Sequence, residues 1–104
     1  RGIPGQMAAG MQTFLVVVKV RLSLPYAHWE SCFDADRAAR AAAGIEDVFR
    51  CPVMGEQAVL YGVRTPNPRM VHDFIYDPRK RPEIEASGFM IGSEQITICE
   101  VTEK

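Results

Sequence analysis

The sequence contains no long hydrophobic run. Its longest continuous apolar segment extends from Phe14 to Val18, far short of the roughly 20 residues that a helix needs to cross a bilayer. An excess of positive charge is also missing, because 12 Lys and Arg residues stand against 13 Asp and Glu residues, a formal net charge of -1. Binding to nucleic acids or anionic membranes relies on a positive field that this composition does not supply. We therefore expect no nucleic-acid partner and no membrane association.

Paired cysteines are absent as well. Cys32, Cys51 and Cys99 are odd in number, lie far apart and form no Cys-x-x-Cys motif, and no signal-like apolar segment follows a basic start. This pattern predicts reduced thiols in a cytoplasmic protein. The chain also has no glycine-rich phosphate loop, no glycosidase-like carboxylate pair and no Ser/His/Asp order. No motif therefore names a reaction, and we expect no cofactor.

Length and composition fit one compact domain. The chain has 104 residues, of which 47% are hydrophobic and 24% charged, the ordinary composition of a globular protein. Residues 1–10 hold three glycines and a proline without periodicity. We expect residues 1–11 to be a flexible tail or a remnant of processing or cloning, with Met7 or Met11 as the natural start. The domain is then expected over residues 12–104.

The first part of this domain has the pattern of a strand followed by a helix. Residues 13–24 place every second side chain, from Phe14 to Leu24, in one apolar row, which is the period of a strand. Pro25 ends the strand and suits the first turn of a helix, and no Gly or Pro follows until Gly44. These signals predict a helix over residues 26–43.

The second part has two more strands, a helix and a last strand. Loose alternation in the first of these strands puts Asp47 and Phe49 on one face, and the next strand is apolar on both faces. Asn67 and Pro68 then have the types that open a helix. The expected elements are strands over 45–53 and 57–65, a helix from residue 68 interrupted at 77–78, a helical turn at 82–87, and a strand over 93–102.

The resulting order is strand, helix, strand, strand, helix, strand. Two split βαβ units of this kind predict an α+β fold, the ferredoxin-like βαββαβ sandwich, in which both helices lie on one face of an antiparallel four-stranded sheet. Several strands carry apolar residues on both faces, with Leu15 and Val17 on the second face of the first strand. An uncovered apolar face of that size is a liability. We therefore expect a homodimer that packs sheet face against sheet face.

The chain resembles a known group, the dimeric α/β-barrel superfamily typified by antibiotic-biosynthesis monooxygenase-like domains. The resemblance covers about residues 12–102 and rests on the element order, on Trp29 and Phe33 in the first helix, on Ala-Gly-Ile at 43–45 and on Ala-Ser-Gly-Phe at 86–89. It implies a cleft between helices and sheet in each subunit of a dimeric α/β barrel. Relatives include cofactor-free oxygenases, isomerases, decyclising enzymes and haem-related proteins, so it implies a fold and carries over no catalytic residue.

Four chemically active residues, His28, Cys32, Asp36 and Arg40, recur every four positions on the expected first helix. At about 100° per residue they form one ridge within the apolar stripe of that helix. Buried polar groups must be paired, so the ridge is either a structural network or the wall of a polar pocket. In the structural interpretation Asp36 and Arg40 form a salt bridge and His28 is a cap. In the functional one His28 is a general acid or base tuned by Cys32 or Asp36.

His72 on the second helix is another candidate for proton transfer, with Asp73 beside it and Tyr76 four residues on. A metal site at His28, Cys32 and Asp36 would need a further ligand such as His72, and we predict no metal. The predicted catalytic residues are His28, Asp36 and His72. The predicted ligand-binding residues are Trp29, Cys32, Phe33, Tyr61 and Phe74.

Together these patterns favour a small-molecule-binding protein that acts as a cofactor-free monooxygenase or isomerase on a small apolar or aromatic substrate. The alternative is a noncatalytic homodimeric binding or accessory module whose polar ridge is only structural. Replacing His28 and His72 by Ala separates the two, because only the enzyme would lose turnover without unfolding.

Overall fold

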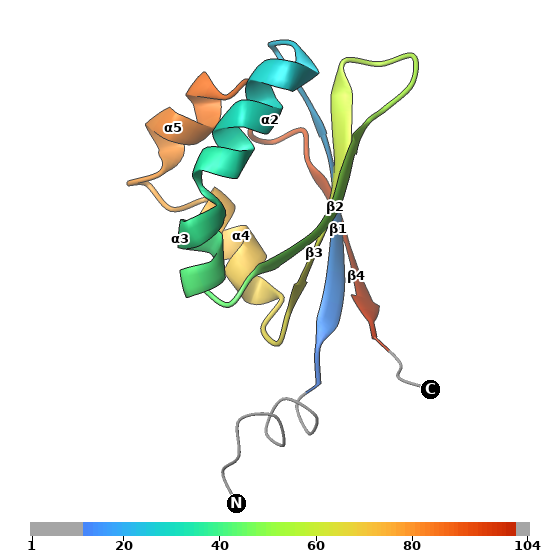
Figure 1. Cartoon of the computed structure of the whole chain (residues 1–104), viewed down its shortest axis with the longest axis vertical. Coiled ribbons are helices and arrows are strands. Elements are labelled where there is room, and N and C mark those ends of the chain that lie inside the picture. Colours follow the sequence, from blue (N-terminus) through green and yellow to red (C-terminus); the bar gives the residue numbers. More distant parts are fainter. Residues whose placement is uncertain (1–11, 102–104) are drawn as a thin grey trace, which may run out of the picture.

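The computed structural model describes residues 12–101, which form one sheet with helices on one of its faces (Figure 1). The predicted tail, residues 1–11, lies outside the described residues, as do residues 102–104. No helix in the described part is long and apolar enough to cross a membrane. The elements are β1 (Phe14–Arg21), α2 (Tyr26–Ala35), α3 (Arg37–Ala42), β2 (Glu46–Pro52), β3 (Ala58–Thr65), α4 (Arg69–Ile75), α5 (Arg81–Ala86) and β4 (Gln95–Glu100).

The sheet has the strand order β2-β3-β1-β4, and every neighbouring pair is antiparallel. The predicted apolar row is confirmed from Val16 to Leu22, where every second side chain is at most 3% exposed. The strand is shorter than predicted, because β1 ends at Arg21 and Leu24 is 39% exposed. Val18 lies opposite Tyr61 of β3 and Ile96 of β4. All three residues therefore face the helices. The topology confirms the ferredoxin-like βαββαβ fold.

The first helix differs from the prediction, because it is divided at Asp36 into α2 and α3. Asp36 has φ -98° and ψ 7°, and its N–H donates to the oxygen of Phe33, 3.2 Å away, which tightens the turn. Aspartate favours helix starts over helix interiors. The Asp36 carboxylate is also bound by Lys80, which immediately precedes α5. Gly44 ends α3 at φ 82°, a left-handed conformation that glycine adopts without strain, as predicted.

The second helix also consists of two pieces, as the sequence predicts. Asn67 accepts a hydrogen bond from the N–H of Arg69 at 3.2 Å, just before α4. Val71 and Ile75 of α4 are buried in the core. The chain then turns at residues 77–78 and continues as α5. The α4–α5 pair and the α2–α3 pair cover the same face of the sheet (Figure 1).

The edge strand β2 departs from simple alternation. Its register shifts between Asp47, which lies opposite Val63, and Phe49, which lies opposite Gly62. One extra residue in a strand reverses the faces of the residues beyond it. Arg50 therefore joins Asp47 on the helix side, where it binds Glu30 of α2 at 3.0 Å. The prediction that Asp47 and Phe49 share a face is wrong because of this bulge.

We call the side of the sheet turned away from the helices the open face. Its apolar side chains include Leu15, Val17 and Leu60, which are half-buried, and Phe49, which is 39% exposed. The Phe49 ring lies over Gly62, because a Cβ added at Gly62 would come within 2.3 Å of it. No other part of the described chain covers this face (Figure 1). The prediction that the sheet is apolar on both faces is confirmed.

Candidate functional site

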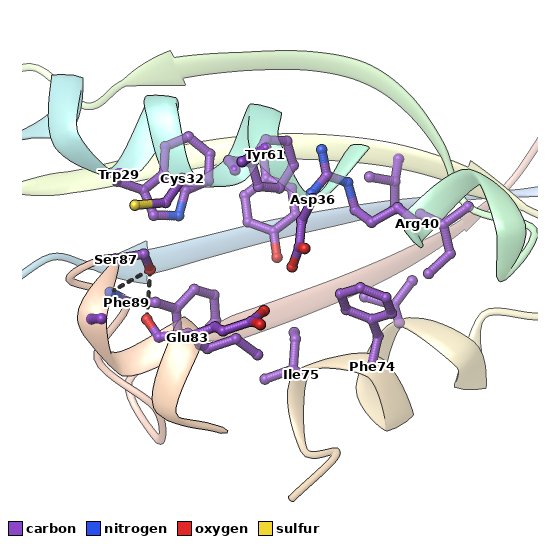
Figure 2. A pocket seen from close by; sticks show the side chains of 17 residues that line it. Trp29, Cys32, Asp36, Arg40, Tyr61, Phe74, Ile75, Glu83, Ser87 and Phe89 are labelled. Carbon is purple, nitrogen blue, oxygen red and sulfur yellow. Dashed lines mark hydrogen bonds between the residues drawn. The ribbon is translucent and has the colours of Figure 1, made fainter. Parts of the chain in front are cut away.

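A cavity of about 510 Å³ lies between the two helix pairs and the covered face of the sheet (Figure 2). Trp29, Cys32 and Phe33 of α2 form one wall, together with Tyr61 from the middle of β3. Aliphatic and aromatic side chains of α4, α5 and the segment before β4 form the opposite wall. The cavity therefore occupies the cleft between helices and sheet that the family resemblance implies, and most of its surface is apolar.

The aromatic wall is a continuous cluster. The ring centroids of Trp29 and Phe33 are 4.5 Å apart with the rings stacked, and those of Phe33 and Tyr61 are 5.0 Å apart. Trp29 and Tyr61 are 5.7 Å apart. Offset and tilted rings at these distances attract one another beyond the burial of their area. The wall is thus a preorganised surface for a planar apolar molecule.

Tyr61 brings a polar group into this apolar wall. Burial raises the pKa of its phenol well above the usual value, against the opposing effect of the nearby Arg40 charge. The hydroxyl therefore keeps its proton at neutral pH. It points into the cavity (Figure 2), and no acceptor for it lies among residues 12–101. Tyr61 is thus a neutral hydrogen-bond donor that faces the cavity.

A buried ion pair supports the same wall. Arg40 is only 5% exposed, and its Nε and Nη2 atoms each donate to a different oxygen of Asp47 at 2.8 Å. Burial alone would raise the pKa of Asp47, but hydrogen bonds and charge from Arg40 and then Arg37 outweigh it and lower the pKa. The guanidinium carbon of Arg40 also lies 3.5 Å from the ring centre of Phe33. The expected Asp36–Arg40 salt bridge is wrong, because Arg40 pairs with Asp47 and Asp36 pairs with Lys80.

A second ion pair crosses the rim of the cavity, from α5 to the break in the first helix. The Lys80 Nζ lies 3.2 Å from Asp36 Oδ1 and 3.4 Å from Glu83 Oε1. Burial lowers the pKa of Lys80, but the bonds to Asp36 and Glu83 outweigh it and raise the pKa. The ammonium also lies 5.3 Å from the ring centre of Phe74. Asp36 and Glu83 thus bring carboxylates to the cavity, with Lys80 shared between them.

His28 lies beside the cavity without lining it. Its Nε2 is 2.9 Å from the carbonyl oxygen of Ala86 and 3.7 Å from the Cys32 sulfur. Because a carbonyl oxygen only accepts, Nε2 must carry the proton, and it cannot then accept one from Cys32. His28 ties α2 to the carboxyl end of α5, which fits the interpretation of His28 as a cap.

His72 lies on the outer side of α4, away from the cavity. Its ring stacks on Tyr76 at 4.7 Å, and its Nδ1 is 3.5 Å from Asp73. The Tyr76 hydroxyl donates to Glu94, and this bond raises the pKa of Tyr76. Both rings are exposed. The structure therefore does not bring His72 together with Asp36.

The structure thus divides the predicted site residues into two groups. Those that line the cavity are Trp29, Cys32, Phe33, Asp36, Tyr61 and Phe74, and those that do not are His28 and His72. Sequence reasoning assigned no site role to Arg40, Glu83 or Phe89, which also line it. Arg40 could have been found from its place in the ridge of four residues spaced every four positions. Phe89 could have been found from its place in the Ala-Ser-Gly-Phe segment at 86–89. Within residues 12–101, no group of three His, Cys, Asp or Glu side chains could hold a metal ion.

No family model and no curated protein sequence matches the chain. Solved structures of other proteins share its fold. A proposed antibiotic-biosynthesis monooxygenase from Caulobacter crescentus is 17% identical, with a TM-score of 0.59 over 89% of this chain and 92% of that one. A monooxygenase from the ActVA-Orf6 gene of Streptomyces coelicolor, solved with the ligand nanaomycin D, is 15% identical, with a TM-score of 0.53 over 89% and 90%.

The third solved structure is a Rhodopseudomonas palustris protein of unknown function. It is 13% identical to this chain, with a TM-score of 0.56 over 96% of this chain and 92% of that one. At these identities the likeness concerns the fold. The chain therefore has the ferredoxin-like fold that these structures share.

Proposed function

We propose that the cavity binds a small planar aromatic molecule and catalyses its oxidation by dioxygen without a cofactor. The observation that carries the proposal is an aromatic wall facing a cavity with a carboxylate at its rim, contributed by Asp36. A cavity of about 510 Å³ is within the usual size of small-molecule sites. Two proteins of the same fold are described as monooxygenases, one of them solved with an organic ligand.

Asp36 acts as the proton acceptor in this proposal. Asp36 is the one predicted acid-base residue that lines the cavity. When Asp36 takes up the proton, the ammonium of Lys80 can remain paired with Glu83, which lies 3.4 Å from it. Removal of a proton from an acidic C–H of the substrate leaves the electron pair on a delocalised anion. Tyr61 donates a hydrogen bond to the oxygen on which that charge gathers.

The anion then reduces dioxygen. For a methylene between aromatic rings, one oxygen atom replaces both hydrogens as a carbonyl and the other leaves as water, and all of the electrons come from the substrate. If the anion is instead reprotonated at another carbon, the same site catalyses an isomerisation. Oxidation and isomerisation thus share their first step at Asp36.

A noncatalytic binding module is the second candidate, and one observation favours it. Lys80 donates a hydrogen bond to Asp36, and the Nε2 of His28 donates one to the carbonyl oxygen of Ala86. These polar groups of the ridge therefore have hydrogen-bond partners within the protein and need no ligand. In either case we propose that a second copy of the chain covers the open face, because Leu15, Val17 and Phe49 form an apolar surface there.

Anthrone tests both candidates, because its methylene is acidic and its oxidation product, anthraquinone, absorbs differently. Trp29, the single tryptophan, reports binding by a change in fluorescence under nitrogen, and an oxygen electrode reports turnover in air. We expect binding and oxygen uptake by the wild type. Asp36→Asn should retain binding and lose oxygen uptake by about 100-fold or more, whereas the exposed Asp73→Asn should change neither.

Three outcomes would contradict the proposal. Binding with no oxygen uptake and no isomerised product above the uncatalysed rate would favour the noncatalytic module. Full activity in Asp36→Asn would remove Asp36 from the mechanism. Loss of uptake in His28→Ala or His72→Ala, with melting temperatures unchanged, would instead return the catalytic role to a histidine.

A further inference from the structure

Arg40 has more hydrogen-bonding capacity than Asp47 uses. A guanidinium carries donors on three nitrogens, and Asp47 takes one bond from Nε and one from Nη2. Arg37 approaches the same carboxylate at 3.4 Å from the outside, so Asp47 serves two cations. The third nitrogen of Arg40, Nη1, has no hydrogen-bond partner among residues 12–101.

Nη1 has accessible surface. Every buried side-chain nitrogen and oxygen of the described chain has a partner, so an unpartnered Nη1 must be accessible. Arg40 as a whole is only 5% exposed and lines the cavity. The result is a buried cation, held rigidly by Asp47 and Phe33, with donors left for a ligand.

The Tyr61 hydroxyl is a second unused donor near the same end. Tyr61 and Arg40 both pack on Phe33, whose ring is 5.0 Å from that of Tyr61 and 3.5 Å from the guanidinium carbon. Figure 2 shows both side chains on the same side of the cavity. Two donors with a positive charge suit an oxygen that carries negative charge, because charge-assisted hydrogen bonds are the strong ones.

We infer that Arg40 and Tyr61 form a subsite for an anionic oxygen of an aromatic ligand. This inference rests on the proposed function and specifies how the ligand lies. The carboxylates of Asp36 and Glu83 also line the cavity, and Lys80 binds both of them. The anionic oxygen lies against Arg40 and Tyr61, and the hydrocarbon skeleton stacks along Trp29 and Phe33.

The test compares 2-naphthoate with 2-naphthamide, which have nearly the same shape and differ in charge, by isothermal titration calorimetry. We expect the wild type to bind the naphthoate about tenfold or more tightly than the amide, the usual effect of a charge-assisted hydrogen bond. Arg40→Lys keeps the positive charge, but a single ammonium cannot both make the two hydrogen bonds to Asp47 and donate from the position of Nη1. This variant should therefore lose most of the preference for the naphthoate. Tyr61→Phe should lower it a few-fold.

Arg37→Lys is the matched control, because Arg37 touches the same Asp47 from the exposed side and does not line the cavity. It should leave the preference unchanged. Circular dichroism checks folding, and if Arg40→Lys does not fold, Tyr61→Phe decides the assignment. Equal wild-type affinities would overturn the subsite and leave aromatic binding in place, whereas binding of neither compound would overturn both. A preference that survives in both variants would overturn the role of these residues.

Discussion

The two faces of the sheet are built from similar residues and differ in what lies against them. On the covered face Val16, Val18 and Val20 are completely buried, whereas on the open face Leu15 and Val17 of the same strand are half-buried. The helices supply the difference, because they cover one face only (Figure 1). Neighbouring residues of one strand are thus equally apolar but contribute unequally to the stability of a single chain.

Polar residues differ between the two faces as well. On the covered face Arg40, Asp47 and Arg50 are held in ion pairs near the cavity, and on the open face Lys19 pairs with Glu56 at 3.0 Å in a solvent-exposed position. An exposed pair contributes little to stability, whereas a buried one becomes costly when either partner is lost. The comparison therefore predicts that a polar change matters according to the face on which it occurs.

The largest effect is expected for Val18→Asp. An unpaired carboxylate would then lie at a position with 0% exposure, and such a charge costs about 3–5 kcal/mol. We expect the free energy of unfolding to fall by this amount, measured as a shift of the urea midpoint by circular dichroism. Val17→Asp, one residue away on the open face, is the control and should stay folded, while losing the self-association that we propose for this face, measured by analytical ultracentrifugation. Equal destabilisation by both changes would contradict the asymmetry.

Next in size is Asp47→Asn, which removes one charge from the buried pair with Arg40. Because charged hydrogen bonds are lost, unfolding free energy should fall by about 2 kcal/mol at pH 7. The pKa of Asp47 is lower in the folded protein than its usual 3.8, so its contribution is present above that pH and disappears as the pH falls through the folded-state pKa.

The difference in unfolding free energy between wild type and Asp47→Asn should accordingly be constant near neutral pH and shrink below about pH 4. Urea unfolding at a series of pH values measures it. The exposed Asp73→Asn gives the comparison and should change stability by less than about 1 kcal/mol. If the difference in unfolding free energy between wild type and Asp47→Asn grew towards low pH, the ionised Asp47 carboxylate would not be stabilising the folded protein.

A smaller effect is expected for Gly62→Ala on the open face. The new methyl group would lie 2.3 Å from the Phe49 ring, and the ring, at 39% exposure, can swing away at a cost of about 1 kcal/mol. Thermal unfolding measures the loss. In a Phe49→Ala background the same substitution should cost much less, and equal losses in both backgrounds would show that the ring does not cover Gly62.

The smallest change in stability is expected for Lys80→Met, which removes the pair across the rim of the cavity. Half-exposed pairs contribute less than about 1 kcal/mol, but the two helix pairs lose their ionic connection through Asp36. Acrylamide should therefore quench the fluorescence of Trp29 more strongly than in wild type. Arg79→Met is the control, because Arg79 pairs locally with Asp77, and quenching equal in the two variants would remove Lys80 from control of access.

Many of the residues that line the cavity could be predicted from the sequence, but the ion-pair partners of its charged residues could not. The apolar rows and the Trp29–Phe33 spacing identify the aromatic wall, and Tyr61 follows from its place in a two-sided strand. The partners of Asp36 and Arg40 were mispredicted, because Lys80 is 44 residues from Asp36 and the partner of Arg40, Asp47, lies on the next strand. His28 and His72 show the same limit, since helical spacing cannot tell which side of a helix faces a cavity.

The sequence by itself determined the order of strands and helices, the apolar character of both sheet faces and the ends of most elements, because these depend on short-range periodicity and on local Pro and Gly signals. Only the tertiary structure decided where the first helix breaks, which carboxylate binds which cation, and that Arg40 retains an unused donor beside a cavity. Those features depend on contacts between residues distant in the chain, and local preferences do not encode such contacts individually.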